Sequence, residues 1–314
     1  MSIDETADCI ASRIDLNMRE GRFARWIALL AGLSSAMSGV EVSYEHYKGS
    51  YSRRIMYTPV VLSGALLVAG VSGFFSKRAA RTVLPAVSAV TLVDCGIGFY
   101  FHVRGVARKP GGWRFPIVNM VMGPPIFAPL LFGLSAYLGI VASSLRRDDS
   151  HDYGMPRPAF QGHWARHMTN GHEPIDAEQD DRERMYQRQL AIAAAGSAFL
   201  SGFEAAYSHY KNNFRYKVQW TPLIVTPMLM IAGMGAVSSR RVAHTWLPAV
   251  SALAIANGTV GFFFHARGTL RRAGGMKKPL YNLIYGPPLF APLLFAASGF
   301  LGMLASVFGS DTKR

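Results

Sequence analysis

Two stretches of the sequence, 163 residues apart, carry the same pattern of a glutamate, a tyrosine and a histidine. The first, 39–47, reads GVEVSYEHY, and the second, 202–210, reads GFEAAYSHY. Each stretch ends a long apolar segment. Carboxylates and imidazoles in or beside such a segment are costly in lipid, so these residues are candidates for ligand binding or proton transfer.

The same offset relates three further pairs of polar residues: His102 and His265, Arg104 and Arg267, and Asn119 and Asn282. The chain is therefore predicted to be a tandem duplication. In each copy we expect the glutamate, both histidines and the asparagine to converge at one end of a helical bundle. The residues expected to support this site are Tyr44, Arg104, Asn119, Tyr207, Arg267 and Asn282.

The paired histidines favour a b-type haem as the first functional hypothesis, because such a haem needs two axial imidazoles from facing helices. The ligands would be His46 with His102 in the first copy and His209 with His265 in the second. Gly98 and Gly261 lie one helical turn before the second histidine and would leave room for the porphyrin. The protein would then be a membrane-embedded redox subunit or anchor.

Three alternatives remain open. A non-haem metal ion would use two histidines and one carboxylate, as in the sets Glu41, His46, His102 and Glu204, His209, His265. A structural polar cluster in a membrane scaffold would pair Glu41 with Arg104 or a histidine. Transport of a proton or small solute would use the interrupted spans described below. Whether the protein is an enzyme stays undecided, since the sequence has no nucleophile-elbow, zinc-protease or phosphate-loop motif.

The elements that must position these residues are apolar segments separated by short basic bridges. They predict an all-α polytopic membrane protein with eight transmembrane helices in two parallel four-helix repeats. The predicted spans are 25–47, 57–76, 82–103, 116–145, 188–210, 220–239, 245–266 and 279–308. Gly-Pro-Pro at 123–125 and 286–288 should interrupt the fourth and eighth spans, because proline removes a helix hydrogen bond. In lipid, the freed carbonyls need another donor.

The predicted division of the chain follows the duplication. Residues 1–24 form a polar N-terminal tail, 25–147 the first four-helix membrane repeat, 148–184 a flexible polar linker, 185–310 the second four-helix membrane repeat and 311–314 a C-terminal tail. With four spans in each copy, both tails and the linker share one side of the membrane. The first twenty residues are polar and acidic, so we expect no cleavable signal peptide, which favours termini in the cytoplasm.

The formal charge of +14 does not indicate a nucleic-acid partner, because Lys and Arg occur in every bridge rather than on one face. With 50% hydrophobic residues, the expected partner is the lipid bilayer, of the inner or cytoplasmic membrane if the protein is bacterial. The bridges that follow the first and third spans of each copy could also dock an acidic soluble or membrane redox partner. Their shared basic positions are Lys48, Arg54, Arg104, Arg108, Lys109 and Arg114 with their counterparts.

Overall fold

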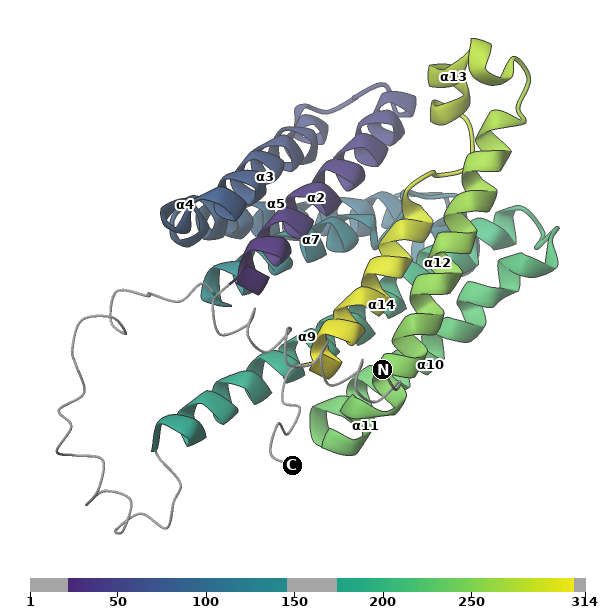
Figure 1. Cartoon of the computed structure of the whole chain (residues 1–314). Coiled ribbons are helices and arrows are strands. Elements are labelled where there is room, and N and C mark those ends of the chain that lie inside the picture. Colours follow the sequence, from purple (N-terminus) through teal and green to yellow (C-terminus); the bar gives the residue numbers. More distant parts are fainter. Residues whose placement is uncertain (1–21, 146–173, 308–314) are drawn as a thin grey trace, which may run out of the picture. The chain divides into compact units, whose positions relative to one another are not determined.

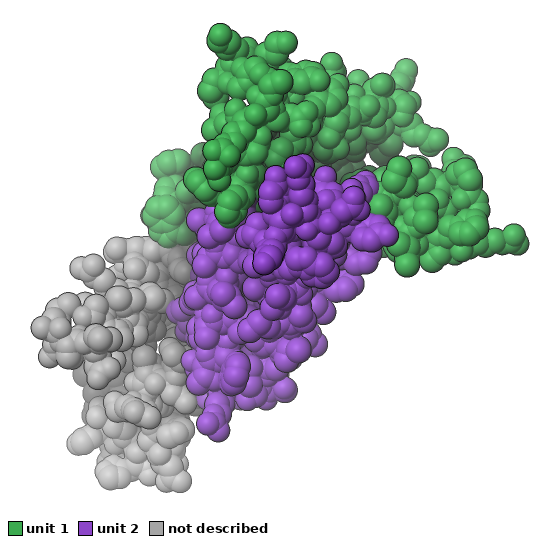
Figure 2. Space-filling view, turned by 90° about the vertical axis from the view of Figure 1, so that its right-hand side faces the viewer, with its two compact units in different colours: residues 1–147, 262–294 green, residues 148–261, 295–314 purple. Residues whose placement is uncertain are grey.

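A computed structural model describes residues 22–145 and 174–307, and these residues form helices and connecting turns without any strand. The chain divides into two compact units (Figure 2). Unit 1 contains 1–147 and 262–294, and unit 2 contains 148–261 and 295–314. Most of the predicted N-terminal tail and linker and all of the predicted C-terminal tail lie outside the described residues, and the predicted division into repeats stays a prediction.

The first copy lies within unit 1. Its α-helices are α2 (Arg22–Lys48), α3 (Thr58–Phe75), α4 (Lys77–Arg81), α5 (Val83–Ala107), α6 (Pro116–Val121) and α7 (Ala128–Leu145). The 3-10 turns η1 (Arg54–Tyr57) and η2 (Gly112–Arg114) lie in the bridges. Helix α2 packs against α3 and α7, and α5 packs against α7 and α3 (Figure 1).

The second copy repeats this order of elements. They are α9 (Pro174–Lys211), η3 (Lys217–Trp220), α10 (Thr221–Ser238), α11 (Arg240–His244), α12 (Trp246–Leu270), η4 (Gly275–Lys277), α13 (Pro279–Ile284) and α14 (Ala291–Val307). Within unit 2, α10 packs against α9 and α11. Helix α9 begins earlier than the predicted span and extends into the segment that was expected to be a linker.

Seven helical segments among the described residues are long and apolar enough to cross a membrane. The eighth predicted span contains α14, which is apolar but has only 17 residues. At the α-helical rise it covers roughly 25 Å, less than the ~30 Å hydrocarbon core. The total of eight spans therefore stays a prediction. The outer surface of α3 suits lipid, since Val61, Val68 and Phe75 recur every seven residues and are 68%, 65% and 79% exposed.

The two predicted breaks are confirmed. Helix α6 ends at Val121 and α7 begins at Ala128, on either side of the first Gly-Pro-Pro sequence. Helix α13 ends at Ile284 and α14 begins at Ala291, on either side of the second. Each break leaves a six-residue helix followed by a longer one.

Glycines bring neighbouring helices into close contact at equivalent places in both copies. A Cβ added to Gly70 would lie 2.5 Å from the carbonyl oxygen of Ala28, so α2 and α3 meet backbone to backbone. A Cβ added to Gly233 would lie 2.8 Å from the carbonyl oxygen of Ala191 in α9. The other recurring contacts are Gly39 with Ser63 and Gly202 with Thr226, then Gly139 with Ser88 and Gly302 with Ser251. Small residues thus allow the close approach that is typical of membrane helices.

Candidate functional site

The second histidine of each copy binds the broken span beside it. His102, near the C-terminal end of α5, has its Nδ1 2.5 Å from the carbonyl oxygen of Pro125. In an α-helix that oxygen would accept from residue 129, but Pro129 has no N–H. His265 repeats the contact, with Nδ1 2.6 Å from the carbonyl oxygen of Pro288. There, the residue four positions later is also a proline, so the imidazole replaces a donor that proline has removed.

The first histidine of each copy has the same role in a bridge. His46 Nδ1 lies 2.7 Å from the carbonyl oxygen of Met56, in η1. A 3-10 turn bonds residue i to i+3, and the residue three positions after Met56 is Pro59. In the second copy, His209 Nδ1 lies 2.9 Å from the carbonyl oxygen of Gln219 in η3, again three positions before a proline. All four histidines therefore face carbonyls that lie three or four residues before a proline.

These contacts also fix the state of each ring. A carbonyl oxygen only accepts hydrogen bonds, so Nδ1 must carry the proton and Nε2 keeps the lone pair in the neutral ring. Of the predicted residues, His46 and His102 are each held by a carbonyl oxygen of their own.

The two asparagines hold the basic bridge that precedes the broken span. The Asn119 side-chain amide donates to the carbonyl oxygens of Pro110 at 3.0 Å and Gly112 at 2.6 Å. Asn282 donates to Gly275 at 3.0 Å, and its own Oδ1 is buried without a hydrogen-bond partner. Both side chains are at least 95% buried. Gly112 and Gly275 have positive φ, so the asparagines stabilise a left-handed turn that glycine makes accessible.

Glu41 contacts the second Gly-Pro-Pro break, within unit 1. Its Oε1 accepts from the backbone N–H groups of Phe290 at 2.6 Å and Ala291 at 3.0 Å, at the start of α14. The positive end of the helix dipole stabilises a carboxylate in this place. The expected pairing of Glu41 with Arg104 or a histidine is wrong, because Glu41 makes no ion pair with any described residue. Arg104 is exposed and bonds the Tyr100 hydroxyl at 3.4 Å.

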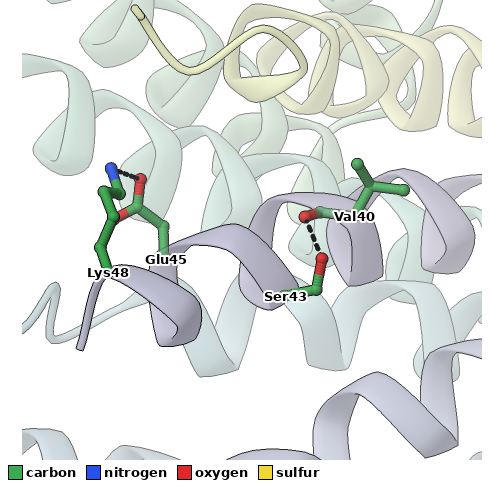
Figure 3. Close-up of polar contacts among 4 residues, drawn as sticks. All are labelled: Val40, Ser43, Glu45 and Lys48. Atoms are coloured by element: carbon green, nitrogen blue, oxygen red, sulfur yellow. Dashed lines mark hydrogen bonds and ion pairs between the residues drawn. The ribbon is translucent and has the colours of Figure 1, made fainter. Parts of the chain in front are cut away.

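The other acidic residue at this end of α2 has a different environment. Glu45 is exposed and forms an ion pair with Lys48 at 2.6 Å (Figure 3). Ser43 bonds the carbonyl oxygen of Val40 on the same helix, 2.7 Å away (Figure 3). These contacts stay within α2, whereas Glu41 connects α2 to a segment about 250 residues later in the chain.

The tyrosine three residues after each glutamate differs between the copies. Tyr207 donates to Glu204 Oε2 at 2.5 Å. The hydroxyl of Tyr44 lies against Glu41 and the backbone of Leu289, and both act on it, although neither contact has the geometry of a good hydrogen bond. Tyr44 is only 6% exposed, so this hydroxyl is buried between these two groups.

A further polar pair joins the second and third helices of each copy. The Thr58 hydroxyl lies 2.6 Å from Asp94 Oδ1 and 2.9 Å from the carbonyl oxygen of Ile55. In the second copy, Asn257 donates to the Thr221 hydroxyl at 2.7 Å, and that hydroxyl donates to the carbonyl oxygen of Val218 at 2.8 Å. A hydroxyl has one proton, so Thr58 can serve only one of its two acceptors at a time.

The predicted ligand sets are not assembled as metal sites. Within the part of the chain that the structure describes, no three His, Cys, Asp or Glu side chains are placed to hold a metal ion together. The space beside Gly98, expected to admit a porphyrin, holds Pro129, whose Cβ would lie 3.2 Å from a Cβ added to that glycine. Arg267, expected to support the second site, is exposed.

Sequence reasoning identified the polar residues but missed their partners. The prolines at 129 and 292 remove the α-helical donors of two of these carbonyl oxygens, and the prolines at 59 and 222 lie three residues after the other two. The sequence signal for these partners was a histidine in one helix together with a proline three or four residues after the carbonyl that the histidine binds. Comparison with protein-family models, curated proteins and solved structures gave no match to this chain.

Proposed function

We propose that the protein is an integral membrane scaffold or anchor in which the Glu, His and Asn side chains lock the broken spans and bridges in place. One observation carries this proposal: all four histidines donate to backbone carbonyls that lie three or four residues before a proline, where a helical donor can be missing. In lipid, no water is available to satisfy such carbonyls, and leaving one unpaired is costly. The side chains then maintain an irregular backbone at the membrane.

The basic bridges give this scaffold a docking surface. In the first copy, the exposed basic residues at the ends of α2 and α5 and in the bridges that follow them are Lys48, Arg54, Arg104, Arg108 and Arg114. Cationic side chains held in a fixed arrangement favour association with an acidic partner. We place the termini on the cytoplasmic side, as the polar, acidic N-terminal tail suggests.

The test is a double-mutant cycle on His102 and Pro129. His102→Ala should lower the unfolding midpoint in detergent, with a cost of about 1–2 kcal/mol for the unpaired carbonyl. Pro129→Ala restores an N–H that can bond the carbonyl of Pro125. In the Pro129→Ala background, His102→Ala should therefore cost less than half as much.

The matched control is the equivalent cycle in the second copy, with His265→Ala and Pro292→Ala, which should behave alike. An equal cost of His102→Ala in both backgrounds would contradict the proposal that His102 replaces the N–H that Pro129 lacks. Tryptophan fluorescence follows unfolding, and size-exclusion chromatography in detergent checks that each variant is folded before heating.

A redox subunit with a b-type haem is the second candidate. The observation that favours it is the Nδ1 bond of each histidine, because ligating histidines usually donate their other nitrogen to a carbonyl or carboxylate. His46 and His102 are the pair that would hold the group in unit 1. The position of Pro129 against Gly98 argues against a porphyrin lying along that glycine. A visible spectrum of protein purified from cells supplied with haem tests it: a Soret band lost in His102→Ala and kept in His244→Ala would favour this candidate.

A further inference from the structure

The bridge that follows α5 exposes apolar side chains and buries a polar one. Within α6, Asn119 is 5% exposed and donates to the carbonyl oxygens of Pro110 and Gly112. The large apolar side chains on either side of it are exposed, each between 49% and 65%: Trp113, Phe115, Ile117, Val118 and Met122. A segment that faces water usually has the reverse arrangement, so this surface suits apolar surroundings.

The second copy has the same arrangement 163 residues later. In α13, Asn282 is 2% exposed and donates to the carbonyl oxygen of Gly275. Four exposed apolar positions correspond: Trp113 to Met276, Ile117 to Leu280, Val118 to Tyr281 and Met122 to Tyr285. The four residues of the second copy are between 47% and 71% exposed. The residue types differ while the exposed apolar character is the same, which indicates that this character has a use in both bridges.

Both bridges are also basic and contain no acidic residue. Four basic residues lie in 104–114 and five in 267–278: Arg104, Arg108, Lys109, Arg114, Arg267, Arg271, Arg272, Lys277 and Lys278. All of them are exposed except Lys109, which is half-buried. Neither 95–147 nor 205–310 contains an aspartate or a glutamate. Within the described residues, none of these nine cations has an ion-pair partner.

The position of the bridges at the ends of long apolar helices decides which partner fits. Helices α5 and α12 have 25 residues each and cover roughly 37 Å, more than the ~30 Å hydrocarbon core. Their C-terminal ends therefore reach the headgroup region, where the lipid phosphates lie. Apolar side chains can enter the acyl boundary at this level while basic ones meet the phosphates. An acidic soluble protein would complement the charges, but lipid complements both the charges and the apolar surface.

We infer that the two bridges, 104–122 and 267–285, are interfacial elements that each bind the phosphate groups of anionic phospholipids. Their apolar side chains enter the membrane beside the spans, and their basic side chains bind the phosphates. Anionic lipid is then the acidic partner of these bridges, so this role rests on the docking surface proposed above. Asn119 and Asn282 contribute by fixing the turns that lead into α6 and α13.

The experiment measures thermal unfolding of the full-length protein in mixed micelles while phosphatidylglycerol replaces phosphatidylcholine at low, constant ionic strength. The unfolding midpoint of the wild type should rise saturably by about 4 °C or more, because a ligand of the native state stabilises it. Arg114→Gln with Lys277→Gln should lose about half of this rise or more, since each basic residue near the surface raises the affinity about fivefold. Ile117→Ser with Leu280→Ser, which keeps every charge, should also lose about half.

The matched control is Arg78→Gln with Arg241→Gln, which also removes two exposed charges. These residues lie in α4 and α11, which contain no large exposed apolar side chain. The control should keep the full rise. An equal loss in both charge variants, or a wild type that does not respond to phosphatidylglycerol, would overturn the inference. Stabilisation in phosphatidylcholine by glycerol phosphate or polyglutamate, lost in Arg114→Gln with Lys277→Gln, would assign the surface to free phosphate or an acidic protein instead and also overturn it.

A second measurement does not depend on the charge variants. The fluorescence of Trp113 is obtained in bilayers as the difference between the wild type and Trp113→Phe. Lipids brominated near the headgroup should quench this fluorescence, and aqueous iodide should not. Quenching by iodide without quenching by the brominated lipids would overturn the inference. The histidine and proline cycle tests the scaffold at constant lipid composition, so failure of one proposal is distinguishable from failure of the other.

Discussion

The first and second copies of the repeat use the same histidine contacts but different contacts around their acidic residues. His46 and His209 bind equivalent carbonyls, and so do His102 and His265. By contrast, Asp94 is replaced by Asn257 as the partner of the threonine at the start of the second helix. The tyrosine hydroxyl forms a hydrogen bond with the glutamate in the second copy, whereas in the first it lies against the glutamate without good hydrogen-bond geometry.

This difference separates two kinds of constraint. A carbonyl whose donor is a proline needs a replacement wherever the proline is kept, so the histidine is kept with it. A carboxylate or hydroxyl that bonds another side chain has several acceptable solutions, because both partners can change together. The copies therefore agree where a side chain serves the backbone and differ where it serves another side chain.

The largest effect should come from the asparagines, which also serve the backbone. Asn119→Ala loses two hydrogen bonds and should destabilise the protein by about 2–3 kcal/mol. Asn282→Ala loses one described bond and removes an amide oxygen that is already unpaired, so about 1 kcal/mol is expected. Unfolding midpoints of the two variants in the same detergent check the order. Equal midpoints would show that the additional hydrogen bond of Asn119 contributes nothing to stability.

The tyrosines should give effects of opposite sign. Tyr44→Phe removes a buried hydroxyl whose contacts with Glu41 and Leu289 fall short of good hydrogen-bond geometry, so it should leave the protein equally stable or more stable by up to about 1 kcal/mol. Tyr207→Phe breaks the bond to Glu204 and should destabilise by about 1–2 kcal/mol. Thermal unfolding of both variants measures the difference. Destabilisation of similar size in both would mean that Tyr44 has a partner in the native state.

The smallest change in stability is expected from substituting asparagine for Asp94 and aspartate for its counterpart, Asn257. Asp94→Asn should cost less than about 0.5 kcal/mol, because the second copy shows that an amide can donate to this threonine while the hydroxyl serves the carbonyl. In Asn257→Asp, the Thr221 hydroxyl would have to donate its single proton to the new carboxylate and could no longer donate it to the carbonyl oxygen of Val218. The substitution should therefore cost about 0.5–1 kcal/mol. Asp94→Ala serves as the reference for complete loss of the pair.

Much of the fold could be predicted from the sequence. Apolar runs and basic bridges located the long helices within a few residues, except that α9 starts earlier. The Gly-Pro-Pro sequences located both breaks, because proline cannot complete the helical hydrogen bonds on either side. These features are local, so a linear sequence contains them. The total of eight spans and the boundaries of the repeats stay predictions.

The partners of the site residues were harder to predict. His46, His102 and Asn119 were expected to converge on one site, which stays a prediction, and the hydrogen bond that the structure shows for each is to a backbone carbonyl. Hydropathy does not show where a backbone acceptor is unpaired, although the proline spacing does. Glu41 is a different case: the sequence Phe-Ala-Pro follows the Gly-Pro-Pro break region in both copies, so nothing local selects 290–291 over 127–128.

The contact between Gly70 and the Ala28 carbonyl has a consequence for motion. With Gly39 against the Ser63 side chain at the other end, α2 and α3 are in close contact at two levels, so sliding one helix past the other would cause a clash. The pair must therefore move as one rigid body. Any rearrangement in this part of the chain has to use the joints at its ends: the turn at Ser76 and the bridge after Lys48, where Ser50 and Tyr51 already have left-handed backbone conformations.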